Sequence, residues 1–166
     1  RVERGFIRVD ADEVTYPLHV ILRYRLEKDM IAGKLEIRDL PEAWNEAFKA
    51  ILGVVPPDFA RGCMQDIHWF EGYFGYFPTY ALGAMTAAQF WVQAEKDVPD
   101  LRLQIRKGNV TAFTNWLLEN IHRQGCLYKP NDLVARVTGC ALDPAVFKAH
   151  LEQRYLGKAQ AARKAG

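Results

Sequence analysis

The sequence predicts an all-α fold, and three observations support that prediction. Apolar side chains recur at intervals of three and four residues over most of the 166 residues, which is the spacing of a helix face. Strict alternation of apolar and polar residues, the pattern of a half-buried strand, is scarce. Prolines and glycines stand between the periodic stretches, where they start and end helices. We therefore expect residues 1–166 to form a single helical domain, or a fragment of one.

The first helix is predicted from Asp12, a residue type that caps helices, to Gly33. Its inward face is expected to carry the apolar residues Leu18, Ile21, Leu22, Leu26 and Met30. Arg23 and Glu27 are expected to turn away from that face. His19 falls on its polar flank and is expected at the surface or in a hydrogen bond.

A second helix is predicted to open at Asp39, because an acid three residues later, Glu42, completes a capping box. Pro41 suits the first turn of such a helix, and Gly53 can end it. The predicted inward residues are Ala43, Trp44, Ala47, Phe48 and Leu52.

In the rest of the chain, stretches broken by proline or glycine alternate with stretches whose apolar residues have helical spacing. Residues 54–63 are predicted to be irregular because Pro56 and Pro57 disfavour helix, and residues 65–76 are predicted to form a loop or short turns. Further helices are predicted, with breaks at proline and glycine, over residues 78–96, 100–107, 110–124, 130–138 and 144–156. Residues 157–166 read as a basic, flexible tail.

Charge and cysteine content narrow the function classes. The net charge is +2 and the basic residues are scattered, so neither a nucleic-acid nor a membrane partner is expected. Three cysteines without C-x-x-C spacing favour a reducing compartment, and neither a signal peptide nor a bilayer-length apolar run is present. A cytoplasmic protein is the expectation. The opening residue Arg1 resembles mid-protein sequence and suggests a fragment.

Several catalytic and metal-binding patterns are missing. No two of the four histidines, at positions 19, 68, 122 and 150, are four residues apart, so no H-E-x-x-H zinc helix exists. The chain contains no serine and therefore no serine nucleophile. The glycines at positions 72 and 75 do not form a phosphate-binding loop.

Two clusters of polar residues remain as candidate sites. Residues 62–80 combine Gln65, Asp66 and His68 with aromatics and glycines, which suits either a pocket for a polar substrate or a merely polar turn. Arg8 precedes the acids Asp10, Asp12 and Glu13. It is either the counter-ion of an acidic helix start or a guanidinium fork held by Asp10 or Asp12 and aimed at a substrate carboxylate.

The two clusters together resemble the signatures of the carboxypeptidase Taq family of zinc metallocarboxypeptidases. Ile7-Arg8-Val9-Asp10-Ala11-Asp12 is similar to I-R-x-x-A-D, and Gly62-Cys63-Met64-Gln65-Asp66-Ile67-His68-Trp69 fills G-x-x-Q-D-x-H-W. The resemblance implies the C-terminal part of an elongated, zincin-like, almost wholly helical enzyme with a deep substrate groove. It also implies removal of single C-terminal residues from peptides, zinc or cobalt as the metal, and a homodimer.

The resemblance also indicates what this chain lacks. In the family, H-E-x-x-H and the third metal ligand, a glutamate, precede I-R-x-x-A-D, and neither is found here. We therefore expect the metal in the full-length enzyme, no metal held by this chain's own residues, and no peptidase activity of the chain alone. The expected partners are peptide substrates, a second copy and the missing N-terminal part.

Roles for individual residues follow from the resemblance. Arg8 is the expected anchor of the substrate's terminal carboxylate, and Gln65, Asp66 and His68 are expected to line the groove. His68 would donate to the substrate backbone or the oxyanion, oriented by Asp66. Tyr76 or Tyr80 would supply a phenolic hydroxyl to the tetrahedral intermediate, and the glycines at 72 and 75 favour Tyr76. The alternative is a non-catalytic, self-associating or interaction module.

Overall fold

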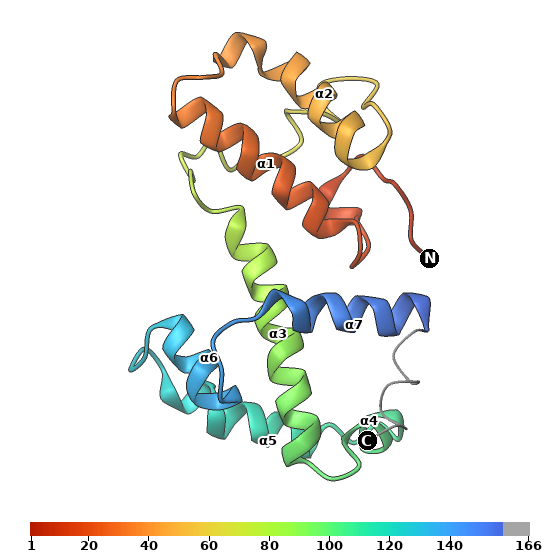
Figure 1. The fold of residues 1–166 in the computed structure, drawn as a ribbon, viewed down its shortest axis with the longest axis vertical. Coiled ribbons are helices and arrows are strands. Elements are labelled where there is room, and N and C mark those ends of the chain that lie inside the picture. Colours follow the sequence, from red (N-terminus) through yellow and green to blue (C-terminus); the bar gives the residue numbers. More distant parts are fainter. Residues whose placement is uncertain (158–166) are drawn as a thin grey trace. The chain divides into compact units, whose positions relative to one another are not determined.

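The computed structural model describes residues 1–157, and all the regular secondary structure in this part of the chain is helical. The all-α prediction is confirmed. The α-helices are α1 (Tyr16–Ile31), α2 (Leu40–Leu52), α3 (Pro78–Asp97), α4 (Leu101–Arg106), α5 (Thr111–Asn120), α6 (Pro130–Thr138) and α7 (Pro144–Leu156). Short 3-10 helices are η1 (Arg8–Asp10), η2 (Ile37–Asp39) and η3 (His122–Gln124). Figure 1 shows their order along the chain.

The chain divides into two compact units, Arg1–Leu82 and Gly83 onward. The division falls inside α3, which the sequence predicts as one continuous helix. Of the predicted tail, residues 157–166, all but Gly157 lie outside the described residues.

The start of α1 differs from the prediction. Asp12 does not cap the helix; its Oδ1 accepts hydrogen bonds from the backbone N–H groups of Val14 (2.9 Å) and Thr15 (3.0 Å). The acid therefore stabilises the turn that leads into the helix, which begins at Tyr16. Pro17 consequently falls in the first turn, where its missing N–H costs nothing.

The start of α2 also differs. Asp39 is the N-cap residue, but its side chain makes no capping hydrogen bond, so the predicted capping box is wrong. The 3-10 turn η2 leads directly into the helix instead, with the N–H of Asp39 donating to the carbonyl of Glu36 at 3.0 Å. The predicted end is confirmed, since Gly53 adopts the left-handed conformation, φ +76°, that glycine tolerates.

The first unit is built on the packing of α1 against α2 (Figure 1). The buried core consists of Leu22, Leu26, Trp44, Phe48, Leu52 and Cys63. Phe6 and Trp69 pack against this core from outside the two helices. Phe6 lies two residues before Arg8, and Trp69 is the last residue of the signature segment. Because both pack on the same core, the core brings the two candidate clusters together.

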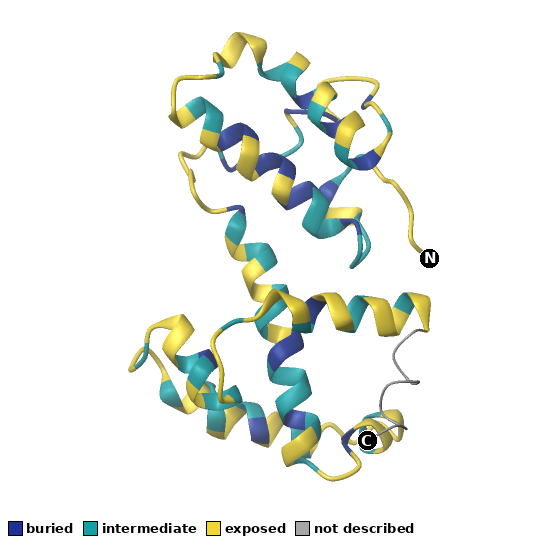
Figure 2. Ribbon diagram, in the orientation of Figure 1, coloured by how far each residue is buried: buried dark blue, intermediate teal, exposed yellow. Residues whose placement is uncertain are grey.

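A second buried face of α1 is polar. His19 and Arg23 are completely buried, and Glu27 is 5% exposed. Figure 2 shows buried positions, in dark blue, along α1. The expectation that Arg23 and Glu27 turn away from the interior is therefore wrong, and His19 is not a surface residue. Apolar periodicity missed this face because a buried polar stripe adds nothing to the apolar pattern.

The second unit has its own core, centred on Ala94, Leu101 and Trp116. Gln89 of α3 is buried, and its amide bonds the connection between α6 and α7: Nε2 donates to the carbonyl of Ala141 (3.0 Å), and Oε1 accepts from the N–H of Asp143 (2.9 Å).

None of the helices described is long and apolar enough to cross a bilayer. All three cysteines are free thiols.

Candidate functional site

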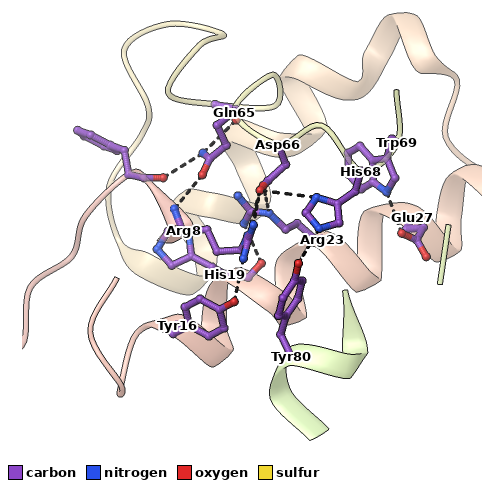
Figure 3. A network of polar contacts seen from close by, with 12 residues as sticks. Arg8, Tyr16, His19, Arg23, Glu27, Gln65, Asp66, His68, Trp69 and Tyr80 are labelled. Carbon is purple, nitrogen blue, oxygen red and sulfur yellow. Dashed lines mark hydrogen bonds and ion pairs between the residues drawn. The ribbon is translucent and has the colours of Figure 1, made fainter. Parts of the chain in front are cut away.

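Four segments of the first unit converge on one polar network (Figure 3). The 3-10 turn η1 contributes Arg8, the signature segment contributes residues 65–69, and the start of α3 contributes Tyr80. The fourth segment, α1, contributes a stripe of Tyr16, His19, Arg23 and Glu27. The structure thus brings the two sequence clusters together, against a helix face that the sequence analysis did not include. Arg8 is held by Asp66, so the expectation that Asp10 or Asp12 holds it is wrong.

Asp66 lies between two arginines. Its Oδ1 accepts from Arg8 Nε (3.0 Å) and Nη2 (2.7 Å), and its Oδ2 accepts from Arg23 Nε at 2.5 Å. The side chain of Asp66 is 10% exposed, that of Arg8 6% and that of Arg23 0%. Two cations share one carboxylate in a nearly water-free setting, so the cluster carries one net positive charge.

The pKa values follow from this arrangement. Burial acts to raise the pKa of Asp66, but the charges and hydrogen bonds of the two arginines outweigh it and hold the pKa below its ordinary value. Burial lowers the pKa of Arg23 to about 10, against the attraction of Asp66. Burial also opposes the charged form of Arg8, but hydrogen bonding to Asp66 raises its pKa overall. All three groups are therefore charged at neutral pH.

Arg8 keeps part of its donor capacity. Its guanidinium has five N–H groups. Two of them bond Asp66, and Nη1 donates to the hydroxyl of Tyr16 at 2.8 Å. The guanidinium also lies over the ring of Tyr80, 4.8 Å from the centroid. The other two N–H groups make no hydrogen bond within the described residues, and the binding of a substrate carboxylate by Arg8 stays a prediction.

Gln65 is engaged at both ends of its amide. Oε1 accepts from the backbone N–H of Arg8 at 2.9 Å, and Nε2 donates to the carbonyls of Phe6 (3.0 Å) and Arg61 (2.9 Å). The side chain therefore fastens the η1 segment to the signature segment. Direct contact of Gln65 with a substrate stays a prediction.

His68 and Tyr80 form a hydrogen-bonded pair. His68 Nε2 lies 2.9 Å from the hydroxyl of Tyr80, and its ring lies 4.4 Å from the ring of Phe77, measured between centroids. His68 Nδ1 is 4.0 Å from Asp66 Oδ1 and has no hydrogen-bond partner within the described part of the chain. At 4.0 Å Asp66 makes no hydrogen bond to the imidazole, so its predicted role in orienting His68 stays a prediction.

The protonation states of this pair also follow from its surroundings. Burial lowers the pKa of His68, and Arg8 and Arg23 lower it further against the opposing charge of Asp66. Burial raises the pKa of Tyr80. At neutral pH the imidazole is therefore neutral and the phenol is protonated. Either group can donate the hydrogen bond between them, and a proton can move along that bond.

Tyr76 lies beside the pair without sharing its hydrogen bond. Its side chain is 47% exposed, and its ring lies 5.7 Å from the ring of His68 and 5.4 Å from that of Tyr80. Exposure makes the Tyr76 hydroxyl accessible, whereas the contact with His68 makes the Tyr80 hydroxyl the better oriented of the two.

Sequence reasoning missed Arg23 and Glu27 as parts of the site. A signal was available, because His19, Arg23 and Glu27 are spaced at intervals of four and lie on one helix face. A stripe of potential charge at helical spacing beside a polar signature is a candidate for a buried network.

The residues described do not fit a metal site. No three His, Cys, Asp or Glu side chains in this part of the chain are grouped to hold an ion. His68 and Asp66 are the nearest to a donor set, and both oxygens of Asp66 are already bound by arginines. A stable site for zinc needs three or four such ligands.

The chain matches known proteins over nearly its whole length. The family model for carboxypeptidase Taq (M32) metallopeptidases matches residues 1–155. The chain is 47% identical to thermostable carboxypeptidase 1 of Thermus thermophilus over 93% of this chain and 30% of that relative. It is 41% identical to carboxypeptidase 1 of Bacillus subtilis over 91% of this chain and 30% of that protein.

Solved structures agree with the sequence matches. The M32 carboxypeptidase of Deinococcus radiodurans superimposes with a TM-score of 0.89 at 41% identity, covering 93% of this chain and 31% of that one. Metallocarboxypeptidase 1 of Trypanosoma cruzi gives a TM-score of 0.88 at 42% identity, covering 94% and 33%. The chain thus spans about a third of the length of the proteins it matches.

Proposed function

The chain belongs to the carboxypeptidase Taq (M32) family of metallopeptidases, and we propose that it forms the substrate-binding part of a carboxypeptidase that releases single C-terminal amino acids from peptides. The observation that supports this most strongly is the network itself. A net positive cluster, Arg8–Asp66–Arg23, lies directly beside a neutral hydrogen-bonding pair, His68–Tyr80.

Each half of the network suits one part of a peptide's C-terminus. The terminal carboxylate is the group by which an exopeptidase distinguishes an end from an internal bond, and the two remaining N–H groups of Arg8 can bind it as a fork. His68 and a tyrosine hydroxyl supply neutral donors for the scissile carbonyl, whose oxygen gains charge as the bond is attacked. Asp66 holds Arg8 by hydrogen bonds, and its charge, 4.0 Å from Nδ1, is proposed to act on His68 through space.

The remaining features of the enzyme are proposed for the part of the family fold that this chain does not span. Zinc or cobalt would be held there, since the residues described here offer no ligand set. A homodimer and a cytoplasmic location stay predictions. We call this chain joined to that remaining part the complete peptidase.

A non-catalytic interaction module is the second candidate. It is favoured by the apolar side chains exposed at the end of the signature and just after it, Ile67, Phe70, Tyr73 and Phe74. Apolar surface of this kind suits coverage by another polypeptide. A complete peptidase that folds, binds metal and yet releases no amino acid would favour this reading.

The carboxylate-anchoring role is tested in the complete peptidase with peptides that have a free or an amidated C-terminus. The wild type should cleave only the free form. Arg8→Lys should raise KM, because an ammonium cannot form the planar fork. Arg23→Lys is the matched control, because Arg23 bonds the other oxygen of Asp66 and is completely buried, so stability should fall while KM is retained. An unchanged KM for Arg8→Lys would contradict the anchoring role.

The same assay separates the two tyrosines. Removing a donor to the tetrahedral intermediate typically lowers kcat about a hundredfold or more. Tyr80→Phe and Tyr76→Phe each delete one hydroxyl and keep the ring, so the variant with the large loss of kcat identifies the donor. No loss in either variant would remove both tyrosines from the mechanism.

A further inference from the structure

Glu27 is a buried carboxylate that no signature of the sequence includes. It lies on α1, one helical turn after Arg23, and is 5% exposed. Its two oxygens have separate partners: Oε2 accepts from the indole Nε1–H of Trp69 at 2.8 Å (Figure 3), and Oε1 accepts a short hydrogen bond from the backbone N–H of Gly75. A buried charge requires such partners.

The chemistry of this contact specifies a carboxylate. Both partners are N–H groups that can only donate, so the residue at 27 must offer two acceptors. Glutamine has the same shape but presents one acceptor and one NH₂ group, which would face a second donor. Of the two side chains, only glutamate satisfies both partners.

The two partners are the ends of one loop. Trp69 closes the signature, and Gly75, at φ +80°, makes the turn before Tyr76 and Phe77. The ring of Trp69 lies 5.7 Å from that of Phe77, which in turn packs on His68. Glu27 therefore fastens the segment on both sides of the aromatic contacts that surround His68.

We propose that Glu27 is a positioning residue: by holding Trp69 and Gly75 on its two oxygens, it fixes the loop that connects His68 to Tyr76 and to the start of α3, which carries Tyr80. The importance of Glu27 for catalysis rests on the function proposed above. The two hydrogen bonds from Trp69 and Gly75 to Glu27, which we name the clamp, do not depend on that function. The loop segment between the two anchors, residues 70–74, contains one glycine and only exposed residues. Apart from Glu27, its order depends on backbone turn hydrogen bonds such as that from the Tyr73 N–H to the His68 carbonyl at 2.8 Å.

The clamp is tested in the 166-residue chain by NMR. Glu27→Gln should shift the indole ¹H–¹⁵N signal of Trp69 and lower hydrogen-exchange protection of the Gly75 amide by about tenfold, the equivalent of one lost hydrogen bond. Glu46→Gln, which removes an exposed carboxylate from α2, is the matched control and should change neither signal. An unchanged Trp69 signal and unchanged Gly75 protection in Glu27→Gln would overturn the proposal.

A double-mutant cycle distinguishes the clamp from a general loss of stability. In Trp69→Phe the indole donor is absent, so a glutamine at position 27 can turn its one acceptor to Gly75. The effect of Glu27→Gln on Gly75 protection should therefore be smaller in that background. An equal effect in both backgrounds would show that the two contacts are independent and would contradict a shared clamp.

Kinetics of the complete peptidase test the positioning role. Glu27→Gln should lower kcat roughly ten- to hundredfold, the cost of small misplacement of reacting groups, with KM nearly retained because Arg8 is untouched. A loosened Gly75 with unchanged kcat would overturn the positioning role. A wild type that folds and binds metal but is inactive would instead overturn the proposed function, and the NMR result would still decide the clamp.

Discussion

At the scale of single residues, the site depends on one carboxylate with two cationic partners. Asp66 is bound by Arg8 and Arg23, and both guanidiniums are almost free of solvent. Removing one member of a buried ion cluster is far costlier than removing an exposed pair, because the remaining charges keep their desolvation cost without their attraction. The signature aspartate is therefore expected to serve stability as much as function.

Asp66→Asn should lower the free energy of unfolding by about 3 kcal/mol, because two buried cations would then face each other without an anion. Asp58→Asn is the control, since Asp58 bonds Arg61 at the surface and its loss should have no measurable effect. Urea denaturation followed by circular dichroism measures both. Equal midpoints for the two variants would contradict the buried-cluster account.

His19 predicts a specific pH dependence. Burial, together with the charges of Arg23 and Arg8, lowers its pKa from 6.5 to about 4, against the opposing charge of Asp66. Between these values the unfolded chain binds a proton that the folded chain does not, so stability falls as the pH drops from 6.5 to 4. The total loss from this residue is about 3 kcal/mol.

Urea midpoints measured from pH 7 to pH 4 test this expectation. His19→Gln should reduce the slope without abolishing it, because the lowered pKa of His68 acts in the same direction. His122→Gln, at an exposed position, is the control and should keep the slope. A His19→Gln slope identical to that of the wild type would contradict the assignment.

At the scale of elements, two glycines near the start of α3 have opposite requirements. Gly75 stands before the helix at φ +80°, a conformation that side chains with a Cβ avoid. Gly83 lies within α3, and a Cβ added there would meet nothing within 4 Å. The first glycine is needed for the turn, and the second only weakens a helix.

Gly75→Ala should therefore destabilise the protein by about 1–2 kcal/mol, the cost of left-handed backbone for an L-residue. Gly83→Ala should stabilise it by about 0.5–1 kcal/mol, since glycine inside a helix is entropically costly. Thermal or urea unfolding of the two variants beside the wild type measures the sign of each change in the free energy of unfolding. Two changes of the same sign would show that backbone conformation does not decide either position.

At the scale of the whole molecule, the chain corresponds to about a third of the length of its relatives. Its described residues hold a complete polar network but no cluster of metal ligands. Recognition of a peptide end and activation of the attacking group are thus expected to come from different parts of the complete peptidase.

The purified 166-residue chain, supplied with zinc or cobalt, should release no amino acid from a peptide with a free C-terminus. Mixing it with a separately produced polypeptide covering the rest of a relative's length should yield metal-dependent release, because the two halves of the site would then be joined. That polypeptide alone is the control. Release by the chain on its own would contradict the division of roles.

The sequence by itself determined the helical class, most helix positions, the Gly53 stop and the two signature clusters, because these depend on local periodicity and on residue types at fixed spacing. Only the tertiary structure decided how the helices start and which side chains meet. Asp12 and Asp39 have capping chemistry, yet neighbouring turns take over their role. The pairing of Asp66 with Arg23, of His68 with Tyr80 and of Glu27 with Gly75 joins residues 12 to 48 positions apart. Such contacts depend on how α1, the signature segment and the start of α3 pack together, which no local pattern specifies.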